Sequence, residues 1–191
     1  MLDSKEIVEI IEDMDIILEE RTIDIIQILS KGEIISENEI AEKLELKINA
    51  ARKSLYQLHT IGFVEYTKEK DEEKKWWYIY FWELNKKKLI EIYKKYKENL
   101  LKTKQKLILS EREFSFQSKD GEQKFTYEDA LANGFVNPEN NAPLVEINNL
   151  ELISQLEQEV HQLNTNITEI AEKLKEVTEI EAKKAKELEE A

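Results

Sequence analysis

The segment Trp76-Trp77-Tyr78-Ile79-Tyr80-Phe81-Trp82 holds all three tryptophans of this 191-residue chain. An unbroken run of aromatic and β-branched residues is typical of a β-strand. The charged run of residues 68–75 precedes this segment and connects it to a second strand candidate, residues 63–67. Together they predict a β-hairpin with an aromatic base and a charged tip.

The side chains of the predicted aromatic strand alternate between two faces. Odd-numbered residues from Trp77 share one face and even-numbered residues from Trp76 share the other, but the alternation does not identify the inner face. Core packing accounts for one set of rings, while an exposed set would stack on unpaired bases for about 1–3 kcal/mol each. The side chains predicted to make such a contact are Lys68, Lys70, Lys74, Lys75, Trp76, Trp77, Tyr78 and Tyr80.

The region before the hairpin predicts helices. Residues 4–30 have helical spacing interrupted near Met14, and Ser36 followed by Glu39 has the form of a capping box that opens a further helix. After a brief turn, the next helix is expected over about residues 48–60. Two helices joined by a short turn form a helix-turn-helix, and the order helix, helix, helix, strand, strand is that of a winged-helix domain. The later helix is in the recognition position, and its predicted exposed face carries Lys47, Arg52, Lys53 and Gln57.

Composition narrows the class of protein. The chain has four glycines, two prolines and no cysteine, so we expect a mainly helical fold without disulfides or thiolate metal sites. Residues 47–110 carry a net charge of +8, whereas residues 1–46 and 111–191 carry −10 and −11. This distribution favours a protein that binds another protein and makes a local nucleic-acid contact over one that coats duplex DNA alone.

Motifs of enzyme chemistry are missing from the sequence. It has no phosphate loop, nucleophile elbow or metal-ligand helix, and His59 and His161 stand alone. We therefore expect no catalytic activity, no cofactor and no bound metal. No apolar run is long enough to span a membrane and the chain does not begin with a signal-peptide pattern, so we expect a cytoplasmic protein located with the nucleoid and no membrane contact.

The expected fold class is mainly α with a small β-hairpin, in four segments. These are a winged-helix domain (1–85), a connector helix (86–110), a small module with strand and turn signals (111–149), for which a family resemblance given below implies a ribbon, and a coiled-coil helix with a charged tail (150–191). The last segment has apolar residues at the a and d positions of four heptads, a pattern typical of a coiled coil. These positions are Ile153, Leu156, Val160, Leu163, Ile167, Ile170, Leu174 and Val177. The branched a positions favour a dimer, but the heptads do not choose among self-pairing, folding back on residues 86–108 and receiving a second subunit.

The segment from Glu39 through Trp82 resembles the winged-helix domain of archaeal transcription factor E, a relative of the alpha subunit of eukaryotic TFIIE. The likeness lies in residues 39–41, in residues 52–58, in Tyr66 followed by a charged tip, and above all in residues 77–82. The aromatic strand after a charged tip is fairly specific, whereas a helix-turn-helix alone is not. The resemblance covers roughly residues 4–149.

A second block strengthens the likeness. Residues 125–144 resemble the central segment and the second knuckle of the zinc ribbon that follows the connector helix in this family. Asn137 and Asn140 stand where that knuckle has cysteines, and Ser118 and Gly121 stand at the first pair. Two amides, a hydroxyl and a glycine cannot replace four thiolates around zinc. We therefore expect the shape of the ribbon without its metal.

The resemblance implies a basal transcription initiation factor that binds RNA polymerase near the clamp and promotes or stabilises promoter opening through its wing. Its implied partners are RNA polymerase, TATA-binding protein, factor B and promoter DNA, in particular the unpaired strand. Two other interpretations stay open: a dimeric, sequence-specific winged-helix regulator, and a protein–protein adaptor without DNA contact. The acidic balance of residues 1–46 weighs against the regulator.

Overall fold

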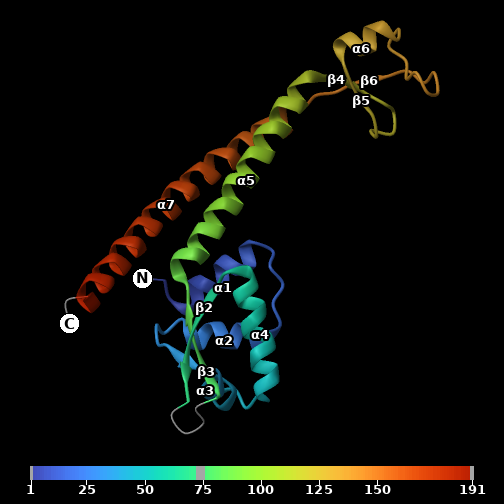
Figure 1. Cartoon of the computed structure of the whole chain (residues 1–191). Coiled ribbons are helices and arrows are strands. Elements are labelled where there is room, and N and C mark those ends of the chain that lie inside the picture. The colour runs from blue at the N-terminus through green and yellow to red at the C-terminus, as the bar shows by residue number, and fades with distance from the viewer. Residues whose placement is uncertain (1, 72–75, 190–191) are drawn as a thin grey trace. The chain divides into compact units, whose positions relative to one another are not determined.

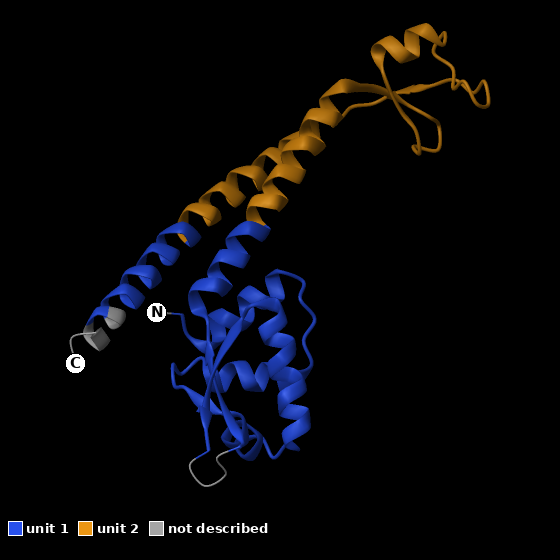
Figure 2. Ribbon diagram, viewed as in Figure 1, with its two compact units in different colours: residues 1–96, 170–191 blue, residues 97–169 orange. Residues whose placement is uncertain are grey.

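The computed structural model describes residues 2–71 and 76–189. Within them the fold is mainly helical with two small antiparallel sheets, as the composition predicts, and none of the helices has the length and apolarity needed to cross a membrane. The chain forms two compact units, residues 1–96 with 170–191 and residues 97–169 (Figure 2). The long helices α5 (Lys86–Glu113) and α7 (Leu150–Glu189) each contribute residues to both units. The four-segment division stays a prediction.

The first unit contains the elements of a winged helix in the predicted order (Figure 1). Its helices are α1 (Ser4–Asp13), α2 (Glu20–Leu29), α3 (Glu37–Lys43) and α4 (Ile48–Ile61). Its strands are β1 (Ile35–Ser36), β2 (Val64–Lys70) and β3 (Tyr78–Leu84), which form an antiparallel sheet in the order β1-β3-β2. The hairpin of β2 and β3 is the wing.

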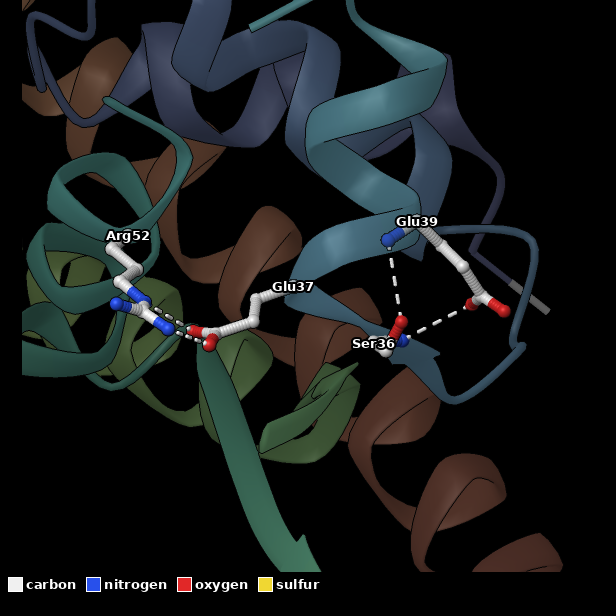
Figure 3. Close-up of polar contacts among 4 residues, drawn as sticks. All are labelled: Ser36, Glu37, Glu39 and Arg52. Carbon is white, nitrogen blue, oxygen red and sulfur yellow. Dashed lines mark hydrogen bonds and ion pairs between the residues drawn. The ribbon is translucent and has the colours of Figure 1, made fainter. Parts of the chain in front are cut away.

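Short-range signals set the limits of the helices that carry the wing. The Ser36 hydroxyl accepts a hydrogen bond from the Glu39 N–H at 3.2 Å, and the Glu39 carboxylate accepts one from the Ser36 N–H at 3.2 Å, which completes the predicted capping box of α3 (Figure 3). Helix α4 ends at Gly62, whose φ of 93° is a left-handed conformation that glycine adopts without strain. This turn sends the chain directly from the recognition position into the wing.

Both strands of the wing lie slightly later in the chain than predicted. Phe63 still belongs to the turn after α4, because its N–H donates to the carbonyl of Leu58 at 2.9 Å. Pairing therefore starts at Val64, which faces Leu84. At the other end of the hairpin the last pair is Lys70 with Tyr78, so Trp76 and Trp77 precede β3 instead of opening it.

The core of the first unit identifies the inner face of the aromatic strand. Trp82 is fully buried, so its even-numbered face points inward at the base of the wing. The largest fully buried apolar side chains around it come from α1 to α4, the turn after α4 and the first turns of α5: Ile7, Ile25, Ile26, Leu29, Ile40, Leu55, Leu58, Phe63, Leu89 and Ile90.

The second unit is a small sheet module carried by two helical segments. Its strands β4 (Phe114–Gln117), β5 (Lys124–Thr126) and β6 (Val145–Glu146) form an antiparallel sheet in the order β5-β4-β6, and the short helix α6 (Tyr127–Ala132) follows β5. The rings of Phe116, Tyr127 and Phe135 lie 5.3–6.3 Å apart and form its aromatic centre.

The heptad residues of α7 pack against other residues of the same chain. Leu156 and Leu163 are buried in the second unit, where ion pairs of 2.5 Å join Lys104 to Glu159 and Arg112 to Glu157. In the first unit, Ile170 is buried in the core and Leu174 and Val177 are half-buried against it. The remaining seam residues, Ile153, Val160 and Ile167, are half-buried. Within this chain, α7 thus packs along segments of the same chain, and pairing with a second chain or subunit stays a prediction.

Candidate nucleic-acid interface

An aromatic cluster joins the wing to helix α4. Residues paired across two strands lie on the same face of a sheet, and β2 pairs Tyr66 with Trp82 of β3. The ring of Tyr66 lies 5.0 Å from that of Trp82 and 5.3 Å from that of Tyr80. From α4, the rings of Tyr56 and His59 lie 6.5 Å and 5.2 Å from the ring of Tyr66. Side chains from three elements, β2, β3 and α4, thus meet on one face.

The outer members of this cluster present their rings to solvent. We call Tyr56, His59, Tyr66, Tyr78 and Tyr80 the aromatic surface; Tyr78 lies beyond Tyr80 on the same face of β3. Tyr56, Tyr66 and Tyr78 expose 43%, 38% and 40% of their area, His59 is exposed and Tyr80 is half-buried. Beneath them, the buried ring of Trp82 packs edge-on against Tyr56 at 5.5 Å. The buried indole anchors the rings above it, so they offer an ordered stacking surface.

Two of the predicted wing lysines lie on the face of the aromatic surface. Lys68 pairs with Tyr80 and Lys70 pairs with Tyr78, and both lysines are exposed. The Lys68 ammonium lies 5.3 Å from the centre of the Tyr78 ring, a cation–π distance. Positive charge therefore lies beside exposed rings, the combination that single-stranded nucleic acid requires. The other two predicted lysines, Lys74 and Lys75, are outside the described residues.

Trp76 and Trp77 form a second pair of exposed rings. They expose 76% and 46% of their area, and their ring centres lie 5.8 Å apart in an edge-to-face arrangement. The Trp77 carbonyl accepts a hydrogen bond from the Asp71 N–H at 3.0 Å, which closes the hairpin beyond the last residue pair of β2 and β3. The rings are thus held at the end of the strand ladder.

Arg52 of the predicted recognition helix is half-buried and paired with a carboxylate. Its Nε donates to the Glu37 carboxylate at 3.0 Å and its Nη2 donates to the second oxygen of that carboxylate (Figure 3). The Glu37 residue is 2% exposed, so this ion pair ties α4 to the start of α3. The hydrogen bond to Glu37 also raises the pKa of Arg52. Helical spacing placed Arg52 on the outer face, and the structure shows its half-buried guanidinium paired with a buried carboxylate from a neighbouring helix.

The other predicted residues of the recognition helix remain exposed. Lys47 is the residue before the first turn of α4, and Lys53 and Gln57 follow along the helix. The Lys53 ammonium lies 3.9 Å from a Glu19 carboxylate oxygen, and the side chains of both are largely exposed. This surface therefore has little concentrated positive charge for duplex DNA.

The part of the chain that the structure describes offers no metal centre. No group of three or more His, Cys, Asp or Glu side chains is placed there to hold an ion. At the positions that the family resemblance assigns to zinc ligands, Ser118 and Asn137 are buried and hydrogen-bonded, Gly121 has no side chain, and Asn140 is exposed. These groups do not fit zinc, which binds thiolates and imidazoles in structural sites.

Three members of the aromatic surface were missing from the predicted site: Tyr56, His59 and Tyr66. Tyr56 and His59 lie three residues apart, so they share one face of the helix, and an antiparallel hairpin brings Tyr66 beside the even-numbered aromatic residues of β3. The spacing of these residues was visible in the sequence. Their meeting on one face could be inferred only from the register of the hairpin and the packing of α4 against it.

Comparison with known protein sequences identifies the family of this chain. A sequence model described as "TFIIE alpha subunit" matches residues 6–113. Transcription factor E of Methanococcus maripaludis is 35% identical over 141 residues, which cover 73% of this chain and 80% of that protein. Transcription factor E of Methanocaldococcus jannaschii is 34% identical over 151 residues, which cover 78% of this chain and 86% of that protein. A solved structure titled "Possible transcriptional regulator" from Methanosarcina mazei Go1 aligns with a TM-score of 0.45 at 12% identity over 55% of this chain and 88% of that chain.

The matched segment of the family model contains the capping box of α3, helix α4 and both strands of the wing. The family consists of transcription initiation factors and is not an enzyme family. The chain belongs to the TFIIE alpha subunit family, together with the archaeal transcription factor E proteins.

Proposed function

We propose that this protein binds RNA polymerase near its clamp and promotes promoter opening by holding unpaired DNA on its wing. In the initiation complex it acts beside TATA-binding protein and factor B. The observation that carries the proposal is the aromatic surface with Lys68 and Lys70 on the same face.

The chemistry of the aromatic surface suits unpaired DNA better than duplex DNA. Exposed rings gain about 1–3 kcal/mol for each base that stacks on them, but the bases of a duplex already stack on one another and hide their faces. Lys68 and Lys70 lie beside the rings, where they attract the phosphates of the same strand. A surface of this kind binds one strand with little dependence on sequence.

The state of the recognition helix supports an initiation factor over a sequence-specific regulator. Reading bases in the major groove commonly relies on arginine or lysine from the recognition helix. Here the Arg52 guanidinium is committed to Glu37, and the Lys53 ammonium lies near Glu19. Helix α4 therefore contributes mainly Tyr56 and His59 to the proposed DNA contact.

Promotion of opening requires differential binding. A factor shifts the equilibrium between closed and open promoter only by the difference between its affinities for the two states. Stacking of a single base, at about 1–3 kcal/mol, corresponds to a factor of roughly 5 to 150 in the population of open complex. One or two stacked bases are therefore sufficient for a clear effect on a weak promoter.

Permanganate footprinting of unpaired thymines tests this proposal. Polymerase, TATA-binding protein and factor B of an archaeal system are assembled on a weak promoter, with wild-type protein or with the variant Lys68→Glu/Lys70→Glu. The variant Lys102→Glu/Lys106→Glu makes the same change in net charge on exposed positions of α5 and is the matched control. We expect wild type and control to increase thymine reactivity and the wing variant to lose most of the increase, while still binding polymerase in a pulldown.

Two results would contradict the proposal. If the wing variant opens the promoter as well as the control, the lysines of the wing are not part of the mechanism. If wild-type protein binds polymerase without changing reactivity, the adaptor interpretation is correct.

A further inference from the structure

Two buried polar side chains lie at the centre of the sheet module in the second unit. Ser118 is 4% exposed and Asn137 is 3% exposed, and they come from two turns 19 positions apart in the sequence. Buried polar groups are costly unless they are hydrogen-bonded. The partners of these two side chains therefore show what holds the turns together.

The first turn is closed by Ser118 and Gln123. The Ser118 N–H donates to the Gln123 carbonyl at 2.8 Å, and the Gln123 N–H donates to the Ser118 hydroxyl at 3.0 Å. The chain reverses through Gly121, which has a φ of +78°, and the Gly121 N–H donates to the Ser118 carbonyl at 2.9 Å. The turn thus satisfies its own backbone and leaves the Gln123 side chain to project beyond it.

The second turn is closed around Asn137. The Asn137 N–H donates to the Ala142 carbonyl at 2.8 Å, and the Asn141 N–H donates to the Asn137 carbonyl at 2.8 Å. The side-chain oxygen of Asn137 accepts a hydrogen bond from the Glu139 N–H at 2.9 Å. These hydrogen bonds all lie within the turn, and the side-chain nitrogen of Asn137 is left to bind outside it.

The Gln123 side chain connects the two turns. Its oxygen accepts a hydrogen bond from the Asn137 amide nitrogen at 2.6 Å, and its own amide nitrogen donates to the Glu139 carboxylate at 2.8 Å. The Gln123 carboxamide therefore satisfies the buried side-chain amide of Asn137 and also binds Glu139 in the same turn. Through the Gln123 backbone, the bridge continues to Ser118.

A metal ion has no suitable ligands at this place. The four positions equivalent to zinc ligands carry Ser118, Gly121, Asn137 and Asn140, and the side-chain oxygen of Asn140 is occupied by the Ala142 N–H at 3.0 Å. None of these groups supplies a thiolate or an imidazole, the ligands typical of structural zinc.

We propose that the Gln123 carboxamide takes the structural role of the metal ion, so that the two turns of this module are joined by hydrogen bonds and the module folds independently of zinc. A structural zinc ion joins two turns through four bonds and contributes folding energy directly. Here the Gln123 side chain joins the turn at Ser118 to the turn at Asn137. The inference does not depend on the function proposed above.

Metal analysis and hydrogen exchange of the full chain test this proposal. The protein is produced in zinc-supplemented medium, its zinc content is measured by mass spectrometry, and its thermal unfolding is recorded with and without EDTA. We expect substoichiometric zinc and an unchanged unfolding midpoint. Stoichiometric zinc, or a midpoint lowered by EDTA, would overturn the proposal.

The variant Gln123→Leu removes the bridge while keeping a side chain of similar size. Because it leaves the buried Asn137 amide unpaired, amide exchange in residues 118–142 is expected to become roughly tenfold faster or more, while Gln158→Leu on the exposed face of α7 leaves it unchanged. Equal exchange in the two variants would refute the bridging role.

If Gln123→Leu unfolds the module completely, Gln123→Glu decides the matter. That variant keeps an acceptor for the Asn137 amide but loses the donor to Glu139 and adds a charge beside its carboxylate, so faster exchange is expected in a module that still folds. Wild-type exchange rates in Gln123→Glu would overturn the proposal.

Discussion

Replacement of Arg52 by Met separates a structural role of this side chain from a DNA-binding role. The change leaves the carboxylate of Glu37, a residue 2% exposed, without its cation. Breaking a fully buried ion pair by removing one partner costs about 3–5 kcal/mol. Because the Arg52 side chain is 34% exposed, water screens part of the interaction. We therefore expect a loss of about 2–3 kcal/mol in the free energy of unfolding.

Urea unfolding followed by tryptophan fluorescence measures this loss. With a slope of about 1–3 kcal/mol per molar urea, the expected decrease lowers the midpoint by roughly 0.7–3 M. Trp82 of β3 is buried beside Tyr56, which shares helix α4 with Arg52, so the emission of Trp82 reports on the affected region.

The double variant Glu37→Met/Arg52→Met provides the control. A buried ion pair can often be replaced by apolar side chains without loss of stability, so most of the midpoint should return. Because Arg52 is assigned no DNA contact here, the double variant should also open promoters as wild type does. A single variant as stable as wild type, or a stable double variant that fails to open promoters, would refute this assignment.

Three further predictions concern pH dependence and the helix seam. Hydrogen bonds from the Asp3 N–H and from Lys173 lower the pKa of Glu6. The contribution of Glu6 to stability is therefore complete above the ordinary glutamate pKa of about 4.3 and is lost as the pH falls through the lowered pKa. The variant Glu6→Gln should accordingly flatten the acid limb of a plot of stability against pH. Burial raises the pKa of Tyr93, and a hydrogen bond to Asp13 raises it further. The contribution of Tyr93 to stability is therefore complete below about pH 10 and is lost as the pH rises toward the raised pKa. The alkaline unfolding of Tyr93→Phe should depend less on pH than that of wild type. Leu163→Ala, at a residue 6% exposed, should cost about 2–5 kcal/mol in thermal unfolding but leave the mass in light scattering unchanged, and a reduced mass would show that the seam joins two chains.

The helices of the first unit were predictable because their signals are local. The capping box needs only Ser36 and Glu39, and the end of α4 needs only Gly62. The strands were predictable as a hairpin, but their limits were not: Phe63 stays in the turn after α4, and the last pair joins Lys70 to Tyr78.

The candidate site was only partly predictable because it combines elements. Arg52 looked exposed from helical spacing, since its partner Glu37 lies 15 residues earlier on another helix. Tyr56 and His59 joined the site only when β2 brought Tyr66 against α4. The alternation in β3 left both faces possible until the burial of Trp82 identified the inner one.

The heptads of α7 gave the apolar positions but not their partner. An apolar seam has the same sequence pattern whether it packs on a second chain or on the same one. The ion pairs of Lys104 with Glu159 and of Arg112 with Glu157 involve residues outside the a and d positions, so the seam alone did not reveal them.

Comparison of a duplex promoter with a pre-melted promoter tests the proposed mechanism most directly. Initial transcription is measured on both templates with and without the protein, using the same polymerase, TATA-binding protein and factor B. If the protein acts by favouring the open state, it should stimulate transcription from the duplex and give little or no stimulation on the template whose start site is already unpaired. Equal stimulation on both templates would contradict a role in opening, because the melting step is absent from one of them.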